Sequence, residues 1–306
     1  MALFNFPYFN HGAPYLPIQD NLMYIKLALE EAGHDVYINP DVEEGAVNVL
    51  FENFNDEQTD MLLLQAKAGT KIVIFASETP TGGTFNDFKT KDSGAGWYGR
   101  NPVWDMRYRN FLRVAEACKQ VWCYRQDQLD LYAKIVPSSW LHFVPLGYVA
   151  GLATVRQMPY RLKDIDFIFT GTMTGQRLSI LNKLQDMGYR VFIPKNILPD
   201  FIRDNICARA KICLGLKQYE EWEATSLIRD YYHLMNGTYY IAEACKISSP
   251  VNNYVATVTS GHLIDACVEA QKRTDLNEIA AQNLERYRQE IPAKPLIAAF
   301  LAKVLG

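Results

Sequence analysis

Residues 166–188 read DFIFTGTMTGQRLSILNKLQDMG and have the pattern of one strand, one loop and one helix. An apolar run leads into a loop with two glycines and three threonines, and a helical pattern follows until a glycine ends it. The run lacks polar alternation, which is typical of a parallel-sheet strand covered by helices on both faces. The stretch therefore predicts a strand over 166–170, a loop, and a helix over 177–187.

The same alternation of strand and helix runs through the chain on both sides of this stretch. In the first half, apolar segments alternate with helical ones that end at Gly33 and Gly69. Around residues 151–163 the periodicity fades, and beyond them it starts again. The pattern predicts an α/β protein with two Rossmann-like, doubly wound domains. Their predicted bounds are 1–155 and 156–290, with a last helical segment over 291–306.

Composition limits the class of protein. The chain has 306 residues, 49% of them apolar and 21% charged, which is ordinary for a soluble protein of two domains. A formal charge of −3 disfavours a protein that coats nucleic acid or an anionic membrane. No apolar run reaches the ~18 residues of a membrane span, and the N-terminus lacks the features of a signal peptide. Six scattered cysteines without a Cys-x-x-Cys pair predict reduced thiols, a cytoplasmic location and no zinc site.

Charge is distributed unevenly along the chain. Residues 20–60 hold eleven acidic side chains and one basic one, whereas residues 156–229 hold twelve basic and eight acidic ones. Two interpretations stay open: both segments form ordinary solvated surfaces, or the second half binds an anion such as a nucleoside diphosphate.

Two strand ends in the second half carry candidate diphosphate-binding residues. In open α/β sheets, ligands bind outside the carboxyl ends of the strands, where helix N-termini offer free N–H groups and a positive dipole. At both ends a hydroxyl-rich loop leads into a helix that carries an arginine in its first turn. The alternative is a plain strand-loop-helix turn with hydroxyl caps. The candidates are Gly171, Thr172, Thr174, Arg177, Lys217, Thr225, Ser226 and Arg229.

The run RDYYHLMNG, from Arg229 to Gly237, resembles the Arg-x-x-Glu…Gly signature in the donor half of GT-B glycosyltransferases. The likeness is closest to the spore-maturation-protein (CgeB-like) group, related to families 1 and 4. The segment VPLGY at 144–148 is similar to that group's Pro-x-Gly motif, and the helical tail 261–304 is similar to its ending. Where the family has glutamate, the chain has Tyr232, which would contact the donor in its place or simply pack.

The resemblance implies the GT-B arrangement of two domains facing a cleft, with the last helix returning to the N-domain. It also implies transfer of a sugar from a nucleoside-diphosphate donor, such as a UDP-sugar, to an acceptor that the sequence does not identify. Arg229, Lys217 and Arg177 would stabilise the departing diphosphate. We expect no metal and no cofactor, because the Asp-x-Asp pair at 164–166 precedes its strand and His233 lacks partners at metal-ligand spacing. A nucleotide-sugar epimerase of the same fold and a non-catalytic nucleotide- or sugar-binding module stay open.

Candidate acceptor-side residues follow the strands of the first domain. His11 and Gly12 come after the first strand, and Glu78 comes after the third continuous apolar strand. In an inverting mechanism His11, Glu78 or Asp20 would act as general base on the acceptor hydroxyl, whereas a retaining mechanism needs no such base. The glycine-rich loop that starts at Glu78 and contains Trp97 is a candidate acceptor lid. The alternatives are a loop histidine and a helix-capping glutamate.

Overall fold

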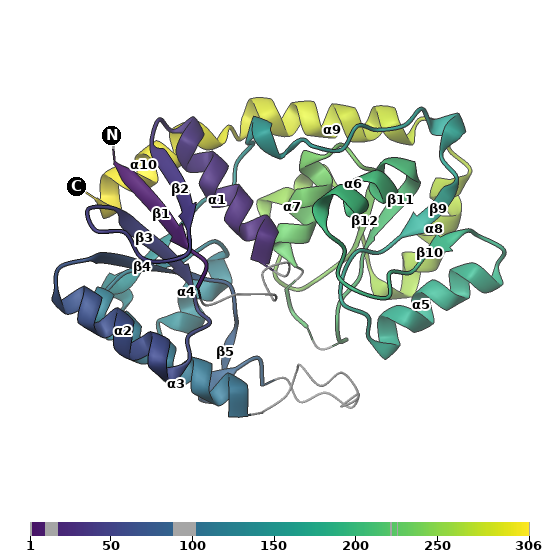
Figure 1. Cartoon of the computed structure of the whole chain (residues 1–306). Helices are drawn as coiled ribbons and strands as arrows, with labels where there is room; N and C mark the ends of the chain where they lie inside the picture. Colours follow the sequence, from purple (N-terminus) through teal and green to yellow (C-terminus); the bar gives the residue numbers. More distant parts are fainter. Residues whose placement is uncertain (1, 10–17, 88–101, 221, 225, 306) are drawn as a thin grey trace. The chain divides into compact units, whose positions relative to one another are not determined.

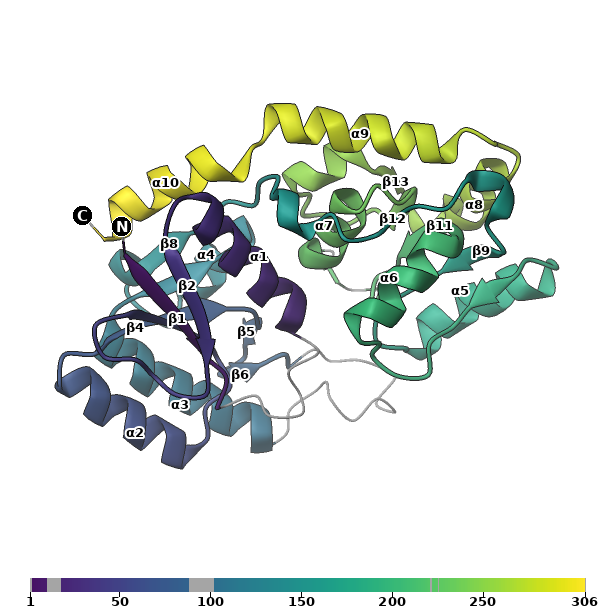
Figure 2. The same cartoon turned by 45° about the horizontal axis from the view of Figure 1, so that its top comes forward.

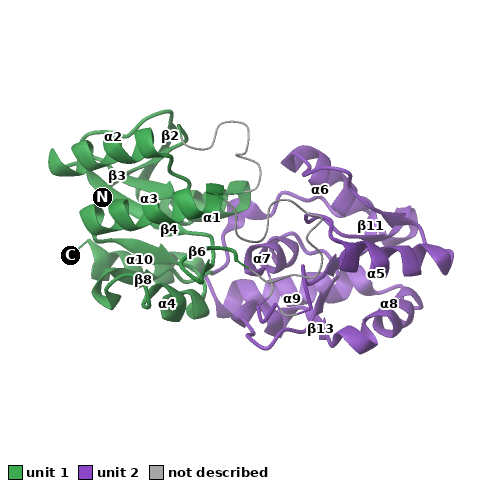
Figure 3. Cartoon of the chain, turned by 90° about the horizontal axis from the view of Figure 1, so that it is seen from below, with its two compact units in different colours: residues 1–146, 293–306 green, residues 147–292 purple. Residues whose placement is uncertain are grey.

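The computed structural model describes residues 2–9, 18–87, 102–220, 222–224 and 226–305 (Figure 1). The chain divides into unit 1, residues 1–146 with 293–306, and unit 2, residues 147–292 (Figure 3). Residues 147–155 belong to unit 2 rather than to the predicted first domain. Their backbone is tied there, since Tyr148 N donates to Ile291 O (2.6 Å) and Gly147 O accepts from the Tyr231 hydroxyl (2.7 Å).

Unit 1 is built on a parallel sheet of six strands in the order β2-β1-β3-β4-β7-β8. The strands are β1 (Leu3–Pro7), β2 (Asp35–Asn39), β3 (Val47–Phe51), β4 (Lys71–Ala76), β7 (Val121–Cys123) and β8 (Leu141–Phe143). The helices are α1 (Gln19–Glu31), α2 (Asp56–Lys67), α3 (Pro102–Cys118), α4 (Gln126–Tyr132) and α10 (Ala293–Val304). Helices α2 and α3 pack together on one face of the sheet, and α1 packs with α10 on the other (Figures 1 and 2).

The local sequence explains these elements. Every residue of β3 is buried, as are the last five of β4, so uninterrupted apolar runs form the inner strands as predicted. Gly33 and Gly69, with φ of +93° and +98°, follow α1 and α2 and adopt a backbone conformation that other residues rarely reach. The predicted loop after Glu78 is partly regular, because Pro80–Thr81 (β5) pairs with Thr84–Phe85 (β6) around two glycines.

The C-terminal helix α10 belongs to unit 1, as the resemblance implied. The Phe300 ring contacts the Trp122 ring on β7, with centroids 4.9 Å apart, and Gln120 Nε2 donates to Val304 O (3.2 Å). Pro295 lies within the first turn of α10, where a missing backbone N–H leaves no hydrogen bond unmade.

Unit 2 repeats the architecture with a parallel sheet of five strands in the order β10-β9-β11-β12-β13. The strands are β9 (Ile165–Ile168), β10 (Val191–Phe192), β11 (Ala210–Gly215), β12 (Tyr240–Glu243) and β13 (Ala256–Val258), the last of which the sequence analysis did not predict. The helices are α5 (Gly175–Asp186), α6 (Asp200–Arg209), α7 (Leu227–Met235), α8 (Leu263–Gln271) and α9 (Leu276–Glu290). These two parallel sheets with intervening helices confirm the predicted pair of Rossmann-like domains.

Strand order reverses once in each sheet, and ligands of open α/β sheets bind at such a reversal. In unit 2 the chain turns one way from β9 to β10 and the other way to β11, and in unit 1 the same reversal lies between β1 and β3. Loops diverge at such a switch point, leaving an open crevice at the carboxyl edge of the sheet. No helix in the described part of the chain is long and apolar enough to cross a membrane.

Candidate active site

The loop after β9, residues 169–174, begins the candidate site of unit 2, and we call it the donor loop. It follows the carboxyl end of β9 at the switch point and ends at Thr174, the N-cap of α5. The Thr174 hydroxyl accepts from Arg177 N (3.4 Å) and donates to Gln218 O (3.0 Å), and the residue is 6% exposed. Thr174 was predicted to bind the donor directly, and this is corrected because its hydroxyl is committed to capping. Thr172 is exposed.

Arg177 holds the donor loop to the loop after β11 and is itself buried, at 2% exposed. Its Nη1 donates to Thr172 O (2.6 Å), its Nη2 to Leu216 O (2.8 Å), and its Nε to Leu216 O and Lys217 O (3.2 and 3.1 Å). The prediction that Arg177 clamps a phosphate is therefore corrected. Its guanidinium satisfies main-chain carbonyl groups that would otherwise be buried without a donor, so it positions the two loops.

Arg229, in the first turn of α7, has the opposite character. Its guanidinium lies 5.0 Å from the centroid of the Phe169 ring, which Arg177 also contacts at 4.7 Å. Arg229 is half-buried, and in the described part of the chain its guanidinium makes no hydrogen bond or ion pair. Glu223, an acid close to it in the sequence, pairs instead with Lys246 (2.9 Å). Arg229 thus presents a cation with unused donors at the carboxyl edge of the sheet.

Gly171 makes room for this cation. A Cβ atom built on Gly171 would lie 2.5 Å from Arg229 Nη2 and 2.5 Å from Phe169 Cζ. Any side chain there would displace the guanidinium or the buried ring, so the glycine is required for a close approach between donor loop and arginine. The structure thus brings together Gly171 and Arg229, two predicted residues that are 58 positions apart in the chain.

Lys217 follows β11 and is held by a residue that the sequence analysis missed. Its backbone N–H donates to the Glu243 carboxylate (2.7 Å), and its Nζ donates to Glu220 O (3.2 Å). Glu243, at the end of β12, is fully buried and also accepts from the Ser260 hydroxyl (2.5 Å). Its position, the last residue of an apolar strand at the carboxyl edge, was the signal available in the sequence. Glu243 therefore fixes the backbone on which Lys217 is carried.

Tyr232 and two hydroxyl residues complete the predicted donor set. The Tyr232 hydroxyl donates to Asp204 Oδ1 on α6 (2.6 Å), and the Arg203 guanidinium lies over its ring at 3.8 Å. Of the two alternatives for Tyr232, contact with the donor or packing, the structure shows packing, because the side chain is buried against α6. Ser226 is the half-buried N-cap of α7, with no side-chain capping bond, and Thr225 lies outside the described residues.

In unit 1, two carboxylates lie at the carboxyl edge of neighbouring strands. Glu52 follows β3 at the switch point, and its Oε1 accepts from Ser77 N and Glu78 N (both 2.5 Å) and from the Tyr132 hydroxyl (3.1 Å). Glu78 pairs through Oε1 with Arg107 Nη2 (2.8 Å) and keeps 23% of its side chain exposed. The structure thus places predicted Glu78 directly beside Glu52, which the sequence analysis missed.

Burial and then the negative charge of Glu78 raise the pKa of Glu52 to about 7, although backbone hydrogen bonds and Arg107 oppose the shift. Glu52 is 1% exposed, so its ionised form is poorly solvated. At pH 6 the carboxyl is mostly protonated, and above pH 7 the pair holds two negative charges. Glu52 therefore changes its charge near neutral pH, next to Glu78.

This pKa predicts a specific pH dependence of stability. A carboxyl whose pKa is higher in the folded state stabilises the fold fully below its unfolded pKa near 4.5, and this contribution is lost as pH rises through about 7. We expect wild type to lose roughly 3 kcal/mol of unfolding free energy relative to Glu52→Gln over this interval, at about 1.4 kcal/mol per pH unit. Urea unfolding from pH 4.5 to 8 measures the difference. The exposed Glu116→Gln is the control, and parallel profiles for wild type and Glu52→Gln would contradict the assignment.

The remaining acceptor-side predictions have mixed outcomes. His11, Gly12 and Trp97 lie outside the described residues. Asp20 lies in the first turn of α1, where a carboxylate stabilises the positive end of the helix dipole. It stays a candidate base alongside Glu78.

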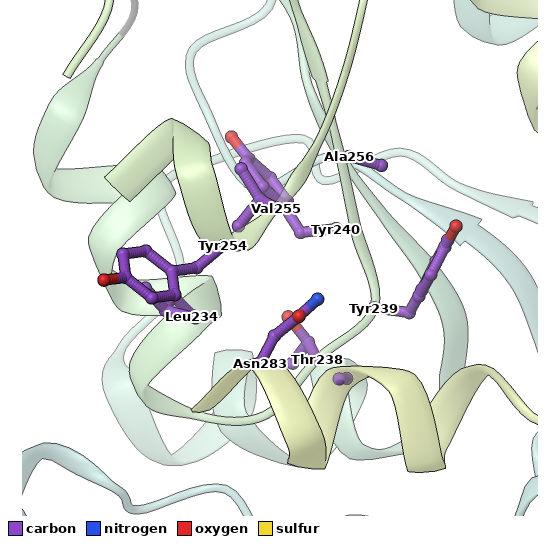
Figure 4. Close-up of a pocket in the computed structure, with 9 residues that line it drawn as sticks. Leu234, Thr238, Tyr239, Tyr240, Tyr254, Val255, Ala256 and Asn283 are labelled. Carbon is purple, nitrogen blue, oxygen red and sulfur yellow. The ribbon is translucent and has the colours of Figure 1, made fainter. Parts of the chain in front are cut away.

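Two cavities of unit 2 can be set aside as diphosphate sites. The first, shown in Figure 4, encloses only about 10 Å³, room for about one water molecule, between α7, α9 and β12. The second has about 360 Å³ and is lined by residues that include Val155, Asn236 and Leu284, but by no charged side chain. A diphosphate needs cations or N–H donors, and the donor loop with Arg229 supplies both.

No protein-family model matches the chain, and no curated protein sequence matches it either. Solved structures do match. A variant of the T4 phage β-glucosyltransferase in complex with UDP-glucose superposes with a TM-score of 0.57 at 14% identity, over 99% of both chains. HepE of Anabaena in complex with UDP gives 0.54 at 12% identity, over 100% of this chain and 99% of that one. The chain has the GT-B fold.

A third GT-B neighbour is larger than this chain. A variant of TarM from S. aureus, in complex with UDP among other ligands, gives a TM-score of 0.50 at 9% identity. The match covers 83% of this chain and 55% of that protein, so the chain spans about half of TarM's length. Sequence identities this low show a shared GT-B fold and nothing more. The reaction that this chain catalyses has to be argued from the residues of its own site.

Proposed function

We propose that this chain is a glycosyltransferase that moves a sugar from a nucleoside-diphosphate donor, in the first instance a UDP-sugar, to an acceptor hydroxyl. The observation that carries the proposal is the half-buried Arg229 guanidinium, which sits against Gly171 of the donor loop without a carboxylate partner among the described residues. Two proteins of the same fold are described with UDP or UDP-glucose bound, which supports this choice of donor.

In the proposed reaction the bond between the anomeric carbon and the diphosphate oxygen breaks, and negative charge develops on the leaving diphosphate. Arg229 offers two parallel N–H donors to its oxygens, and the exposed Thr172 hydroxyl and donor-loop N–H groups add further donors. The acceptor oxygen forms the new bond and loses its proton. In an inverting reaction Glu78 is the candidate to receive that proton.

The proposal includes metal independence, with Arg229 and Lys217 supplying the positive charge. The Asp-x-Asp motif at Asp164 and Asp166 does not supply a metal site for this reaction in the proposal, because it lies at the amino end of β9. Asp164 pairs with Arg209 (2.5 Å), and Asp166 pairs with Lys211 (2.8 Å) and Arg190 (3.2 Å). Both carboxylates are therefore neutralised by cations and lie away from the ligand edge.

The acceptor is left open by the described residues. A T4 phage β-glucosyltransferase is described as a DNA-modifying enzyme. The excess of acidic side chains over residues 20–60 disfavours a nucleic-acid acceptor here. Membership of the CgeB-like group and a cytoplasmic location stay predictions, and six free thiols fit the latter.

The test is thermal unfolding of the full chain with UDP, GDP, ADP or CDP, followed by assay of the matching nucleotide sugar. A nucleoside diphosphate at 100 times its Kd stabilises by roughly 2.7 kcal/mol, whereas uridine without phosphates should do little. Sugar transfer to an acceptor from a panel of glycans, proteins, small molecules and DNA supports the proposal. Isomerisation of the sugar without acceptor indicates the epimerase, and tight binding with neither reaction indicates a binding module. No stabilisation by any diphosphate would overturn the donor site.

A further inference from the structure

Two thiols and an imidazole converge in the core of unit 2, behind the donor loop. Cys207 comes from α6, Cys213 from β11 and His233 from α7, and one ligand atom of each lies within 4.8 Å of the others. All three residues are at most 1% exposed. The sequence expectation that His233 lacks such partners is wrong, because the three ligands come from three elements and their spacing follows no local motif.

The His233 ring is oriented as a metal ligand is. The Thr238 hydroxyl donates its proton to His233 O (3.1 Å) and lies 3.0 Å from His233 Nδ1. With the Thr238 proton on His233 O, Nδ1–H is the donor in the second contact; Nε2 then keeps its lone pair and lies 3.5 Å from the Thr170 hydroxyl. Tyr240, which is labelled in Figure 4, stacks on the His233 ring with the centroids 4.6 Å apart. A fixed acceptor on the far nitrogen is the usual outer-shell support of a metal-binding histidine.

The electrostatic surroundings favour negative charge on sulfur. Lys163 is 4% exposed, and its Nζ donates to Ala210 O and Gln157 Oε1 (both 2.8 Å). Its charge acts on both Cys207 and Cys213, so a buried cation is available to balance negative charge on the sulfurs.

We propose that Cys207, Cys213 and His233 bind a thiophilic, closed-shell metal ion, Cu⁺ or Zn²⁺, of which Cu⁺ is the better match. Two thiolates, the Lys163 ammonium and Cu⁺ sum to zero charge, which suits a fully buried site. Soft sulfur ligands without a carboxylate select Cu⁺ and Zn²⁺, and structural zinc sites almost always use four protein ligands rather than three. Binding as thiolates releases the thiol protons. The bound ion would link α6, β11 and α7. Its ligand on α7, His233, lies four residues after Arg229.

The test counts metal in the purified full chain. The protein is produced with Cu⁺ or Zn²⁺ supplied during folding, because the site is buried, and is desalted without oxygen. We expect one equivalent of metal in wild type and a sulfur-to-metal charge-transfer band, both lost in the double variant Cys207→Ser/Cys213→Ser. Cys267→Ser, which changes another fully buried thiol of unit 2, is the matched control and should keep the metal. His233→Gln should weaken binding by at least ~10-fold.

Each outcome decides the proposal. Wild-type protein that folds with less than about 0.1 equivalent of either ion would overturn it, whether or not the variants fold, because a buried site of this kind loads during folding. Equal metal in wild type and the double variant would overturn it too. If the double variant does not fold, the single variant His233→Gln and a metal-dependent rise in wild-type Tm replace it. Zinc in place of copper at the same stoichiometry supports the site and names the ion.

Discussion

Arg229→Lys is expected to lower kcat/KM for sugar transfer. The activation free energy should rise by about 2–4 kcal/mol, the loss typical of removing one donor that stabilises developing charge. This corresponds to a rate loss of roughly 30- to 900-fold. A lysine keeps the charge but cannot reproduce the two parallel N–H donors of a guanidinium or its contact with the Phe169 ring. Since charge on the diphosphate grows in the transition state, most of the loss should appear in kcat. Steady-state kinetics with the donor identified by thermal unfolding measure it.

Two arginine-to-lysine controls make this result specific. Arg286→Lys changes another guanidinium that lies over a ring in unit 2, that of Tyr254 (4.5 Å), and should leave kcat/KM unchanged. Arg177→Lys removes donors from buried carbonyl groups, so it should lower the free energy of unfolding by about 1–3 kcal/mol. Arg229→Lys should instead keep wild-type stability. Full activity in Arg229→Lys, or a fall in its stability like that of Arg177→Lys, contradicts the catalytic role.

Most of the fold could be predicted from the sequence, because parallel strands and glycine-ended helices leave strong local patterns. The Lys71–Ala76 strand has its predicted bounds, and Gly33 and Gly69 end their helices as predicted. The short edge strand β13 was missed, since three half-exposed residues have no periodicity to detect. The domain boundary was placed too late because hydrogen bonds from Tyr148 and Tyr231, distant in sequence, decide it.

The candidate site was predictable only in part, because a residue type and its place on a strand end do not fix where its side chain goes. Arg177 and Arg229 occupy equivalent first-turn positions, yet only the first has buried carbonyl groups within reach. Tyr232 was assigned from the family pattern, and its contact with Asp204 of α6 overrides that pattern. Glu52 was missed because its burial and its proximity to Glu78 depend on β3 and β4 pairing side by side.

Glu78→Gln tests the other half of the proposed reaction, and we expect kcat to fall by about 10²- to 10⁴-fold, the range for loss of a general base. Stabilisation by the nucleoside diphosphate should stay at the wild-type value, because Glu78 belongs to unit 1 and the donor loop to unit 2. The glutamine keeps the shape of the side chain and one acceptor oxygen for Arg107, but its NH2 group replaces the oxygen that accepts from Asn86, so one hydrogen bond of the site is lost. Single-turnover kinetics with saturating donor separate this loss from binding.

The pH profile supplies a second readout of the same pair of carboxylates. When Glu52 ionises near pH 7, a negative charge appears beside the proposed proton acceptor and favours movement of the acceptor's proton into the site, so kcat should rise through that pH. Glu52→Gln should remove this rise and leave a flat profile there. Glu116→Gln, on the exposed side of α3, should leave both rate and profile unchanged.

If Glu78→Gln keeps wild-type kcat while Asp20→Asn loses it, the base is Asp20. If both variants keep it, Glu78 is only the structural partner of Arg107, and either His11 is the base or the mechanism is a retaining one, which needs no base on the acceptor side.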